Sequence, residues 1–294
     1  MGQYSIKELE RLSGIKAHTI RIWEKRHNII QPQRTETNIR YYSDEDLKKI
    51  INVSLLNTHG IKISKIAEMS FEEISRMILD MSEAKNDASL YIDQLVVAMV
   101  DMEEERFEKT LNTVIQHIGF QECVTQIIYP FMEKIGVLWQ TKKINPAQEH
   151  FISNLVRQKL IVSIAALPIH SKKIKSAILF LPEGDLHEIG LLFYHYITRS
   201  KGFKTYYLGQ SVPYEDLKMV YQIHRPTILI TSFISAPSPK QLENYIHSLS
   251  QDFPEATILA SGLMLRNTAF LIPKNVKPFY RATELPALLD HFLV

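Results

Sequence analysis

Three short stretches in the second half of the 294-residue chain have residue types and a spacing that suit ligand binding. The first is Asp185-x-His187-x-x-Gly190, the second, Ser232-Phe233-Ile234, begins after 41 residues, and the third, Ser261-Gly262, after 26 more. A loop histidine is usually an ordinary surface residue, so the first stretch alone predicts little. All three, however, follow predicted strands, and the carboxyl ends of parallel strands share one edge of a sheet. The pattern therefore predicts an extended ligand that threads between them.

The elements that position these stretches alternate between strand and helix. Apolar, β-branched runs predict strands at about 176–181, 205–208, 227–231, 257–260 and 276–279. Helical stretches lie between and after them, at about 187–201, 214–224, 239–250, 263–271 and 283–293. This alternation predicts a flavodoxin-like, doubly wound parallel sheet of five strands in a domain over 171–294.

The middle of the chain has a different apolar period. Gly and Pro are rare there, and apolar residues recur at helical spacing, which predicts helices at about 71–81, 87–101, 103–118, 120–139 and 146–167. We interpret residues 76–170 as a linker helix followed by a four-helix bundle. Three residues differ from the otherwise apolar core predicted for this bundle. They are Trp139 and, after nine intervening residues, the adjacent Glu149 and His150.

Residues 1–75 have the pattern of a winged helix-turn-helix. Ser5 caps a first helix, and Ser13-Gly14-Ile15 separates it from a second helix over about 17–26. A basic, β-prone loop follows, and Ser43 then caps an acidic helix start. The second helix alone is equally compatible with a solvated face; the wing behind it favours DNA. The candidate DNA contacts are Lys16, His18, Thr19, Arg21, Arg34, Arg40 and Tyr41.

Charge and composition narrow the classes of function. The net charge is only +2, but the first 42 residues hold eight Lys/Arg against four Glu, a surplus that favours a phosphate-bearing partner. A single cysteine, Cys123, excludes disulfides within the chain and metal sites built from several cysteines. No apolar run approaches ~18 residues, and the N-terminus has no apolar signal core. We therefore expect a soluble, cytoplasmic protein.

The N-terminal pattern resembles the MerR family of winged helix-turn-helix regulators over roughly residues 3–72. The resemblance rests on Thr19-x-Arg21-x-Trp23-Glu24, on Pro32-x-Arg34 and on Arg40-x-Tyr42-Ser43. It implies binding to double-stranded DNA, with Trp23 as a packing residue. The family often has a glycine in the wing where this chain has Asn38-Ile39.

The C-terminal stretches resemble the cobalamin-binding domain of the methionine synthase and mutase type. The resemblance implies a cobalamin cofactor, adenosylcobalamin in the first place, with His187 as the lower axial ligand of cobalt. Asp185 then stands behind the imidazole, because a carboxylate on the second ring nitrogen fixes the tautomer. Gly190 and Ser232 are expected to line the pocket for the nucleotide tail. Ile234 stands where the family has a leucine, which is a mild change in shape. Ser261 stands where the family has the first glycine of a Gly-Gly pair, and Gly262 is the second. The serine side chain narrows the pocket.

Trp139 with Glu149 and His150 resembles the bundle motif of CarH-type light-dependent repressors. Those proteins have a MerR module, a helical bundle and this cobalamin domain in the same order, so the resemblance covers essentially the whole chain. It implies that Trp139 caps the upper face of the corrin, that Glu149 and His150 contact the same region, and that the chain forms a homo-oligomer, a dimer or tetramer. Gln140 stands where a photoreceptor histidine ligates cobalt after light, and a carboxamide is a weaker ligand.

Together these patterns predict a cobalamin-responsive, DNA-binding repressor that acts by promoter occlusion and is not an enzyme. Light, cofactor supply and a partner protein remain open as the signal. Two alternatives stand beside this prediction. One is a corrinoid methyl-carrier protein, which would have no use for residues 3–42. The other is a repressor with a vestigial cobalamin site, supported by Ser261 and Gln140 alone.

Overall fold

The chain divides into two compact units, Met1–Leu155 and Val156–Val294, whose boundary falls within helix α10 (Pro146–Ala165). The computed structural model describes residues 3–293 except 71–72, 75, 79–80, 82–86, 141–144, 170–174, 235–237 and 267–269, and except the side chains of 137–140.

The N-terminal unit begins with a helix-turn-helix. Helix α1 (Ile6–Ser13) starts in a capping box, in which the Ser5 N–H donates to Glu8 Oε2 at 2.5 Å. It ends at Gly14, whose φ of 72° closes the helix, and α2 (Ala17–His27) follows. The predicted break between the two helices is confirmed. Trp23 of α2 is buried, as expected for a packing residue.

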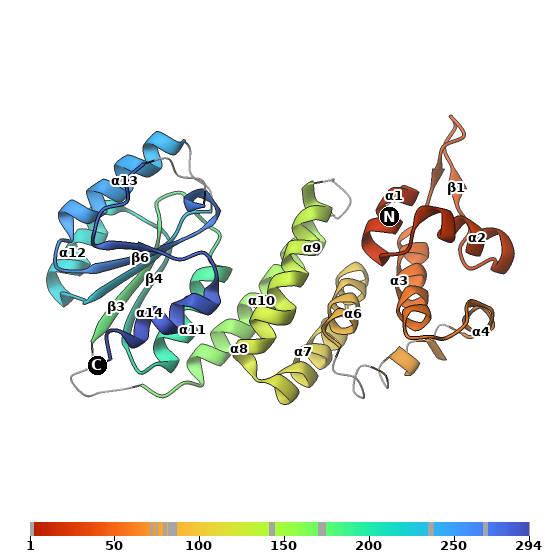
Figure 1. Ribbon diagram of the computed structural model, residues 1–294, viewed down its shortest axis with the longest axis horizontal. Helices are drawn as coiled ribbons and strands as arrows, with labels where there is room; N and C mark the ends of the chain where they lie inside the picture. Colours follow the sequence, from red (N-terminus) through yellow and green to blue (C-terminus); the bar gives the residue numbers. More distant parts are fainter. Residues whose placement is uncertain are drawn as a thin grey trace. The chain divides into compact units, whose positions relative to one another are not determined.

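A two-stranded wing follows α2. Strands β1 (Gln33–Arg34) and β2 (Arg40–Tyr41) pair antiparallel, and Asn38 takes a left-handed φ of 64° in the turn between them. Helix α3 (Asp44–Thr58) then starts in a second capping box, where the Asp46 N–H donates to Ser43 Oγ at 3.2 Å, and α4 (Ile63–Ala67) completes this part of the fold. In Figure 1 the hairpin projects away from the helices that carry it. The predicted wing is confirmed.

The middle of the chain is helical, as predicted. Helices α6 (Ala88–Asp101) and α7 (Glu104–Ile118) precede a long helical stretch composed of α8 (Phe120–Cys123), η1 (Val124–Ile128) and α9 (Tyr129–Gln140), and α10 follows. η1 is a π-turn, which the apolar spacing did not predict. Cys123, at the start of that turn, is fully buried. The linker helix predicted over 71–81 falls partly outside the residues described.

The C-terminal unit is built on a parallel sheet of five strands in the order β4-β3-β5-β6-β7. The strands are β3 (Ser176–Pro182), β4 (Lys204–Val212), β5 (Ile228–Ser232), β6 (Thr257–Ser261) and β7 (Val276–Pro278). The chain runs from β3 to β4 on one side and then returns across β3 to β5 on the other side. This strand order is that of flavodoxin-like folds. The predicted fold is therefore confirmed, and its switch point lies beside the end of β3.

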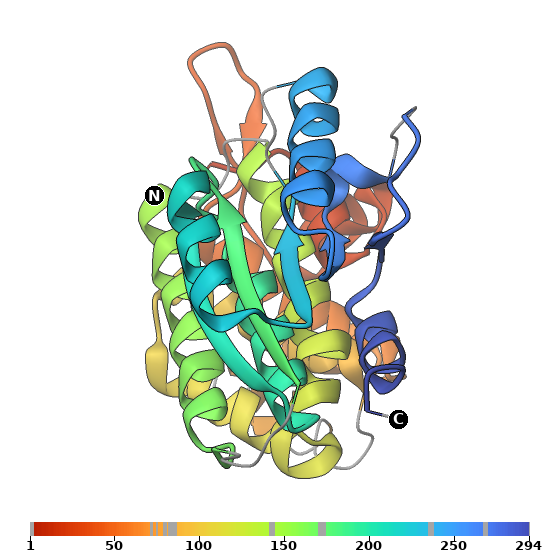
Figure 2. The ribbon, with the colours of Figure 1, turned by 90° about the vertical axis from the view of Figure 1, so that its left-hand side faces the viewer.

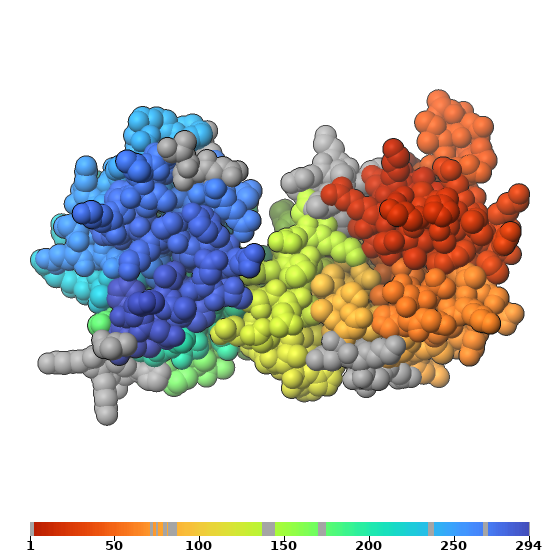
Figure 3. All heavy atoms as spheres, viewed as in Figure 1, coloured from red at the N-terminus to blue at the C-terminus, as the bar shows by residue number. Residues whose placement is uncertain are grey.

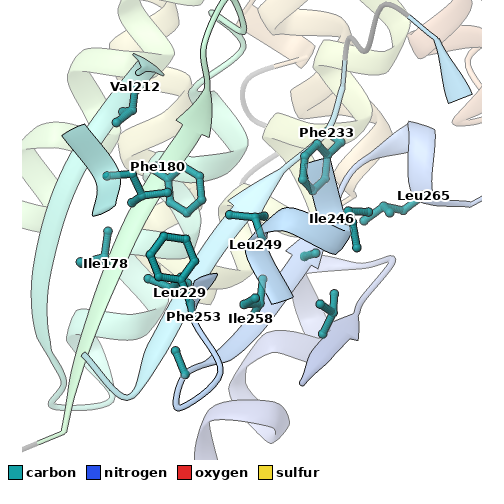
Figure 4. Packing of buried hydrophobic residues seen from close by; sticks show 14 of the residues in the cluster. Ile178, Phe180, Val212, Leu229, Phe233, Ile246, Leu249, Phe253, Ile258 and Leu265 are labelled. Atoms are coloured by element: carbon teal, nitrogen blue, oxygen red, sulfur yellow. The ribbon is translucent and has the colours of Figure 1, made fainter. Parts of the chain in front are cut away.

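Helices cover both faces of this sheet. α12 (Tyr214–His224) and α13 (Pro239–Asp252) lie in front of the strands in Figure 2, while α11 (Ile189–Ser200) and α14 (Leu285–Asp290) pack on the other face. Figure 4 shows the core beneath α12 and α13, where Phe180, Leu229 and Ile258 of the strands meet Ile246 and Leu249 of α13.

Two predicted helices of this unit need correction. The helix predicted over 263–271 is wrong in the part that the structure describes: η2 (Leu263–Leu265) is a 3₁₀ turn, and 270–273 are irregular. Leu265 is buried while Leu263 and Leu271 are exposed, and the Met264 N–H donates to the Phe233 carbonyl at 3.2 Å rather than to a helical partner. The last helix, predicted over 283–293, is shorter: η3 (Ala282–Glu284) leads into α14.

Candidate functional site

The loop after β3 presents Asp185 and His187 at the carboxyl edge of the sheet. A tight turn with Gly184 at φ 84° follows the strand, and the Asp185 N–H donates to the Pro182 carbonyl at 3.0 Å. The end of β4 holds the loop from the side, because the Gly184 N–H donates to Ser211 Oγ at 3.0 Å. The predicted helix start at 187 is two residues too early: α11 begins at Ile189, which leaves His187 in the loop.

Asp185 fixes the orientation of His187. The carboxyl group is almost fully buried, and its Oδ1 lies 2.9 Å from His187 Nδ1 and accepts the His187 backbone N–H at 3.0 Å. Since an ionised carboxylate only accepts hydrogen bonds, the ring hydrogen belongs on Nδ1 and the lone pair on Nε2. The imidazole is 61% exposed. His187 thus offers its Nε2 to a ligand at the edge of the sheet.

A single imidazole does not hold a bare metal ion. Among the residues that the structure describes, no group of three His, Cys, Asp or Glu side chains is placed to bind one. One exposed imidazole can serve as the axial donor of a metal whose other positions are filled by a macrocycle, as those of cobalt are in a corrin.

The rim around His187 is apolar. Leu186, Ile234 and Leu263 follow the ends of β3, β5 and β6, and their exposed fractions are 62%, 37% and 63%. Exposed aliphatic side chains gathered at one edge suit a broad apolar ligand better than a small polar one. Sequence reasoning noted Ile234 only as a replacement and missed the two leucines, although each directly neighbours a motif residue.

The structure brings the predicted tail-pocket residues Gly190, Ser232 and Ser261 together. Both serines are buried, with their Oγ atoms 3.2 Å apart. A Cβ added at Gly190 would have only Tyr194 Oη within 4.0 Å. Tyr194 Oη in turn lies 3.0 Å from Ser261 Oγ. Sequence reasoning missed Tyr194, although its position one helical turn after Gly190 was a usable signal.

Gly262 lies against the backbone of the neighbouring loop. Its φ is 111°, and a Cβ there would come within 2.2 Å of the Phe233 carbonyl oxygen. The ends of β5 and β6 approach so closely at this point that only glycine fits.

Behind the loop, the buried carboxylate of Glu188 contacts a half-exposed arginine and a tyrosine. The carboxylate is paired with Arg157 Nε at 2.5 Å and accepts the Tyr207 hydroxyl at 3.0 Å. Burial and this carboxylate raise the pKa of Tyr207 above its usual range. Glu188, the residue next to His187, is therefore held by Arg157 of α10 and Tyr207 of β4.

His195 stacks on Tyr207, and its Nε2 lies 2.9 Å from Thr205 Oγ1. Burial and, to a smaller extent, the charge of Arg199 lower its pKa to about 4. An unfolded histidine has a pKa of about 6.5, so the unfolded chain binds this proton first on acidification. Above pH ~6.5 we expect His195 to cost the folded protein no stability. Between pH ~6.5 and pH 4 the free energy of unfolding should fall, and the part of the fall that His195 causes is at most about 3 kcal/mol.

Urea unfolding at pH 7 and pH 5 measures this loss. His195→Gln keeps a hydrogen-bonding side chain but cannot titrate, so it should lose less stability than the wild type between the two values. An equal loss in both proteins would show that His195 is not the group responsible.

The bundle residues are described only in part. Glu149 and His150 lie in the first turns of α10, where Glu149 Oε2 is 2.9 Å from His150 Nδ1 and Glu149 Oε1 accepts Ser153 Oγ at 2.5 Å. His150 is exposed. Trp139 and Gln140 end α9, but their side chains lie outside the described part of the chain. The expected contacts of Trp139 and Gln140 therefore stay predictions.

The candidate DNA contacts lie on α2 and the wing. Lys16, His18, Arg21, Arg34 and Arg40 are exposed, and Thr19 and Tyr41 are half-buried. Figure 3 shows the wing standing out from the surface of the N-terminal helices. The Tyr41 hydroxyl donates to Gln33 Oε1 at 2.6 Å across the hairpin.

Glu24 of α2 contacts two residues at the end of the wing. It lies 3.7 Å from Arg40 Nε and accepts the Tyr42 hydroxyl at 3.1 Å. The carboxylate thus holds the wing against α2. In the protein without DNA, Arg40 is paired with Glu24, so a DNA phosphate that binds Arg40 would replace that carboxylate.

Comparison with known families assigns both modules. Residues 4–72 match the model of the MerR HTH family regulatory protein, and residues 91–162 match that of the B12 binding domain. The chain joins a MerR HTH domain to a B12-binding domain. The second match covers α6 to α10, most of it the helical stretch in which sequence reasoning placed the cofactor cap. The predicted family resemblance is confirmed, and cobalamin is supported as the cofactor.

The chain is similar over most of its length to two transcriptional repressors. The chain is 25% identical over 257 residues to the HTH-type transcriptional repressor CarH of Myxococcus xanthus, covering 85% of each chain. It is 24% identical over 263 residues to CarA of the same organism, covering 89% of this chain and 87% of that one. Among solved structures, the Methanosarcina barkeri monomethylamine corrinoid protein superposes with a TM-score of 0.57 at 18% identity, over 70% of this chain and 100% of that chain. The last similarity establishes the fold alone.

None of the helices described is long and apolar enough to span a lipid bilayer.

Proposed function

We propose that this protein is a cobalamin-responsive transcriptional repressor. The observation that carries the proposal is the exposed His187, oriented by the buried Asp185 at the carboxyl edge of the sheet, in a chain that begins with a winged helix-turn-helix. The named relatives CarH and CarA are transcriptional repressors. The proposed role is regulation in the cytoplasm by ligand and DNA binding, rather than catalysis.

The roles of the cofactor residues follow from their positions. His187 would ligate cobalt from below, and Asp185 would keep its Nε2 free for that bond. Gly190, Ser232, Ser261 and Gly262 would face the nucleotide side, and Trp139, Glu149 and His150 the opposite face of the corrin. When bound, adenosylcobalamin supplies a cobalt–carbon bond that light can break.

DNA binding would use the N-terminal unit in pairs. α2 would enter the major groove with Lys16, His18, Thr19 and Arg21, and the wing would contact the backbone through Arg34, Arg40 and Tyr41. A homo-oligomer, a dimer or a tetramer, would hold two half-sites about one helical turn apart. Such a complex would repress by occluding the promoter.

The deciding experiment measures the visible spectrum, the oligomer mass and the DNA affinity of the purified protein with adenosylcobalamin in the dark and after green light. We expect dark binding, a larger oligomer and tighter DNA binding. Reversal by light would make the protein a photoreceptor in spite of Gln140, and persistence after light would make it a sensor of cofactor supply. No change in DNA affinity with cofactor would contradict the proposal and favour a vestigial site.

A second candidate function is that of a corrinoid methyl carrier; the Methanosarcina barkeri monomethylamine corrinoid protein has a similar fold. A carrier would bind the cofactor but would show no affinity for duplex DNA.

Removing Arg21 or Arg40 should weaken DNA binding because each presents an exposed guanidinium. For each phosphate that a variant no longer neutralises, the slope of log K against log salt should fall by about 0.9. Shift assays with Arg21→Ala and Arg40→Ala on a duplex selected from a random pool measure both quantities. Lys240→Ala, which removes an exposed cation from α13, is the matched control. Wild-type salt slopes in both arginine variants would show that the DNA-binding face is assigned wrongly.

A further inference from the structure

The last residues of β4 form a bulge beside the loop that follows β3. β4 is an edge strand of the sheet, and over the interval from Phe180 to Pro182 of β3 the register shifts, so that β4 has one extra residue. Ser211, within this bulge, has a left-handed φ of 47°, which is uncommon for a residue other than glycine. Bulges next to functional sites often serve to redirect a side chain.

Both polar groups of Ser211 hold the loop after β3. Its Oγ accepts the Gly184 N–H at 3.0 Å, and its own N–H donates to the Asp185 carbonyl at 3.1 Å. Gln210 adds a third contact, because its Nε2 donates to the Leu186 carbonyl at 3.1 Å. The end of β4 thus contacts three consecutive residues of the loop, directly before the proposed cobalt ligand.

Asp185 passes this constraint on to His187. Its carboxylate Oδ1 lies 2.9 Å from His187 Nδ1 and accepts the His187 backbone N–H at 3.0 Å, and its Oδ2 accepts the Ile234 N–H at 3.4 Å. Asp185 is therefore held at its carbonyl by β4 and at its carboxylate by the segment after β5. A shift of the Asp185 backbone would move the carboxylate that orients the imidazole.

We propose that Ser211 is a positioning residue for the cobalt ligand, an inference that rests on the cobalamin-binding function above. Ser211 fixes the backbone of Gly184 and Asp185, and through Asp185 it keeps the imidazole of His187 in one orientation. The strained backbone of Ser211 brings its hydroxyl and its N–H to the same loop. Without the hydroxyl, the loop occupies additional conformations, and the apparent affinity for cobalamin falls with the fraction of loops that can ligate.

The test is a visible titration of the full chain with adenosylcobalamin in the dark. Ser211→Ala loses the acceptor for Gly184, so we expect the dissociation constant to rise about fivefold, as for one hydrogen bond, with a smaller spectral signature of histidine ligation. Ser211→Asn should bind within about twofold of the wild type, because asparagine tolerates a left-handed backbone and offers a side-chain oxygen. Ser200→Ala, which removes a hydrogen-bonded serine at the C-terminal end of α11, should leave both readings unchanged.

The same substitution in a His187→Ala background separates positioning from a general structural role. If Ser211 acts through His187, Ser211→Ala should not weaken binding further once the imidazole is gone. A serine that only stabilises the domain would weaken binding equally in both backgrounds.

Hydrogen exchange tests the contact in the protein without cofactor. The Gly184 amide should exchange faster in Ser211→Ala than in the wild type, with the melting curve confirming a folded protein. Ser211→Gly loses the same acceptor and relieves the strained backbone, so it takes the place of Ser211→Ala if that variant does not fold. An unchanged exchange rate, an unchanged dissociation constant or an equal loss in both backgrounds overturns the inference while cobalamin binding stands. If the wild type binds no cobalamin, the proposed function fails and the inference fails with it.

Discussion

Replacing His187 by alanine is expected to lower the affinity for cobalamin by at least about tenfold and to remove the spectral signature of histidine–cobalt ligation. The reason is geometric. His187 Nδ1 is held at 2.9 Å by Asp185, so Nε2 is the nitrogen offered to the metal. Alanine removes that donor while leaving the loop backbone, which is fixed by Pro182 and Ser211, intact.

Visible titration with adenosylcobalamin measures both effects. His291→Ala, an exposed histidine of the same unit, is the matched control and should behave as the wild type. Asp185→Asn should give an intermediate loss, because the amide no longer fixes the tautomer of His187. A wild-type spectrum in the His187 variant would remove this residue from the cobalt site.

Replacing Gly262 by alanine is expected to lower the free energy of unfolding by about 3 kcal/mol or more. The added Cβ would lie 2.2 Å from the Phe233 carbonyl oxygen and 2.5 Å from its backbone N and C atoms, at a φ of 111°. Backbone cannot move away as a flexible side chain can, so the ends of β5 and β6 must separate.

Gly136→Ala is the matched control for the glycine prediction. Gly136 lies in helix α9, and a Cβ there has nothing within 4 Å. This variant should gain about 0.5–1 kcal/mol, because alanine is the better helix former. Urea unfolding of both variants measures the contrast. Similar stabilities would mean that the two loops are not packed as tightly as described.

Local rules were enough to predict much of the fold. Ser5, Gly14 and Ser43 mark helix ends through capping chemistry that depends on a few neighbouring residues, and all three are confirmed. The strand order also followed, because alternating strands and helices leave few ways to build a parallel sheet. The helix predicted over 263–271 failed because apolar spacing does not decide which acceptor a backbone N–H finds: the Met264 N–H donates to the Phe233 carbonyl, a tertiary contact between distant segments.

The candidate site was predicted unevenly for the same reason. Asp185 and His187 are two residues apart, so their contact was readable from the motif, and Ser232 and Ser261 met because their strands are neighbours. Tyr194 was missed because its residue type does not distinguish a site residue from a core residue, and only its position one helical turn after Gly190 pointed to the site. Its hydroxyl becomes informative only when the ends of β5 and β6 are in place.

The burial of Cys123 has a practical consequence for the oligomer. It is the one cysteine of the sequence, and it is fully buried beside the π-turn of the bundle. A buried thiol in an apolar setting reacts poorly. Self-association of the folded chain must then be noncovalent, with no need for reducing agents to exclude cross-linked artefacts. A cysteine introduced at an exposed position would be the only readily labelled thiol, so distances between protomers could be followed by fluorescence as the ligand is added.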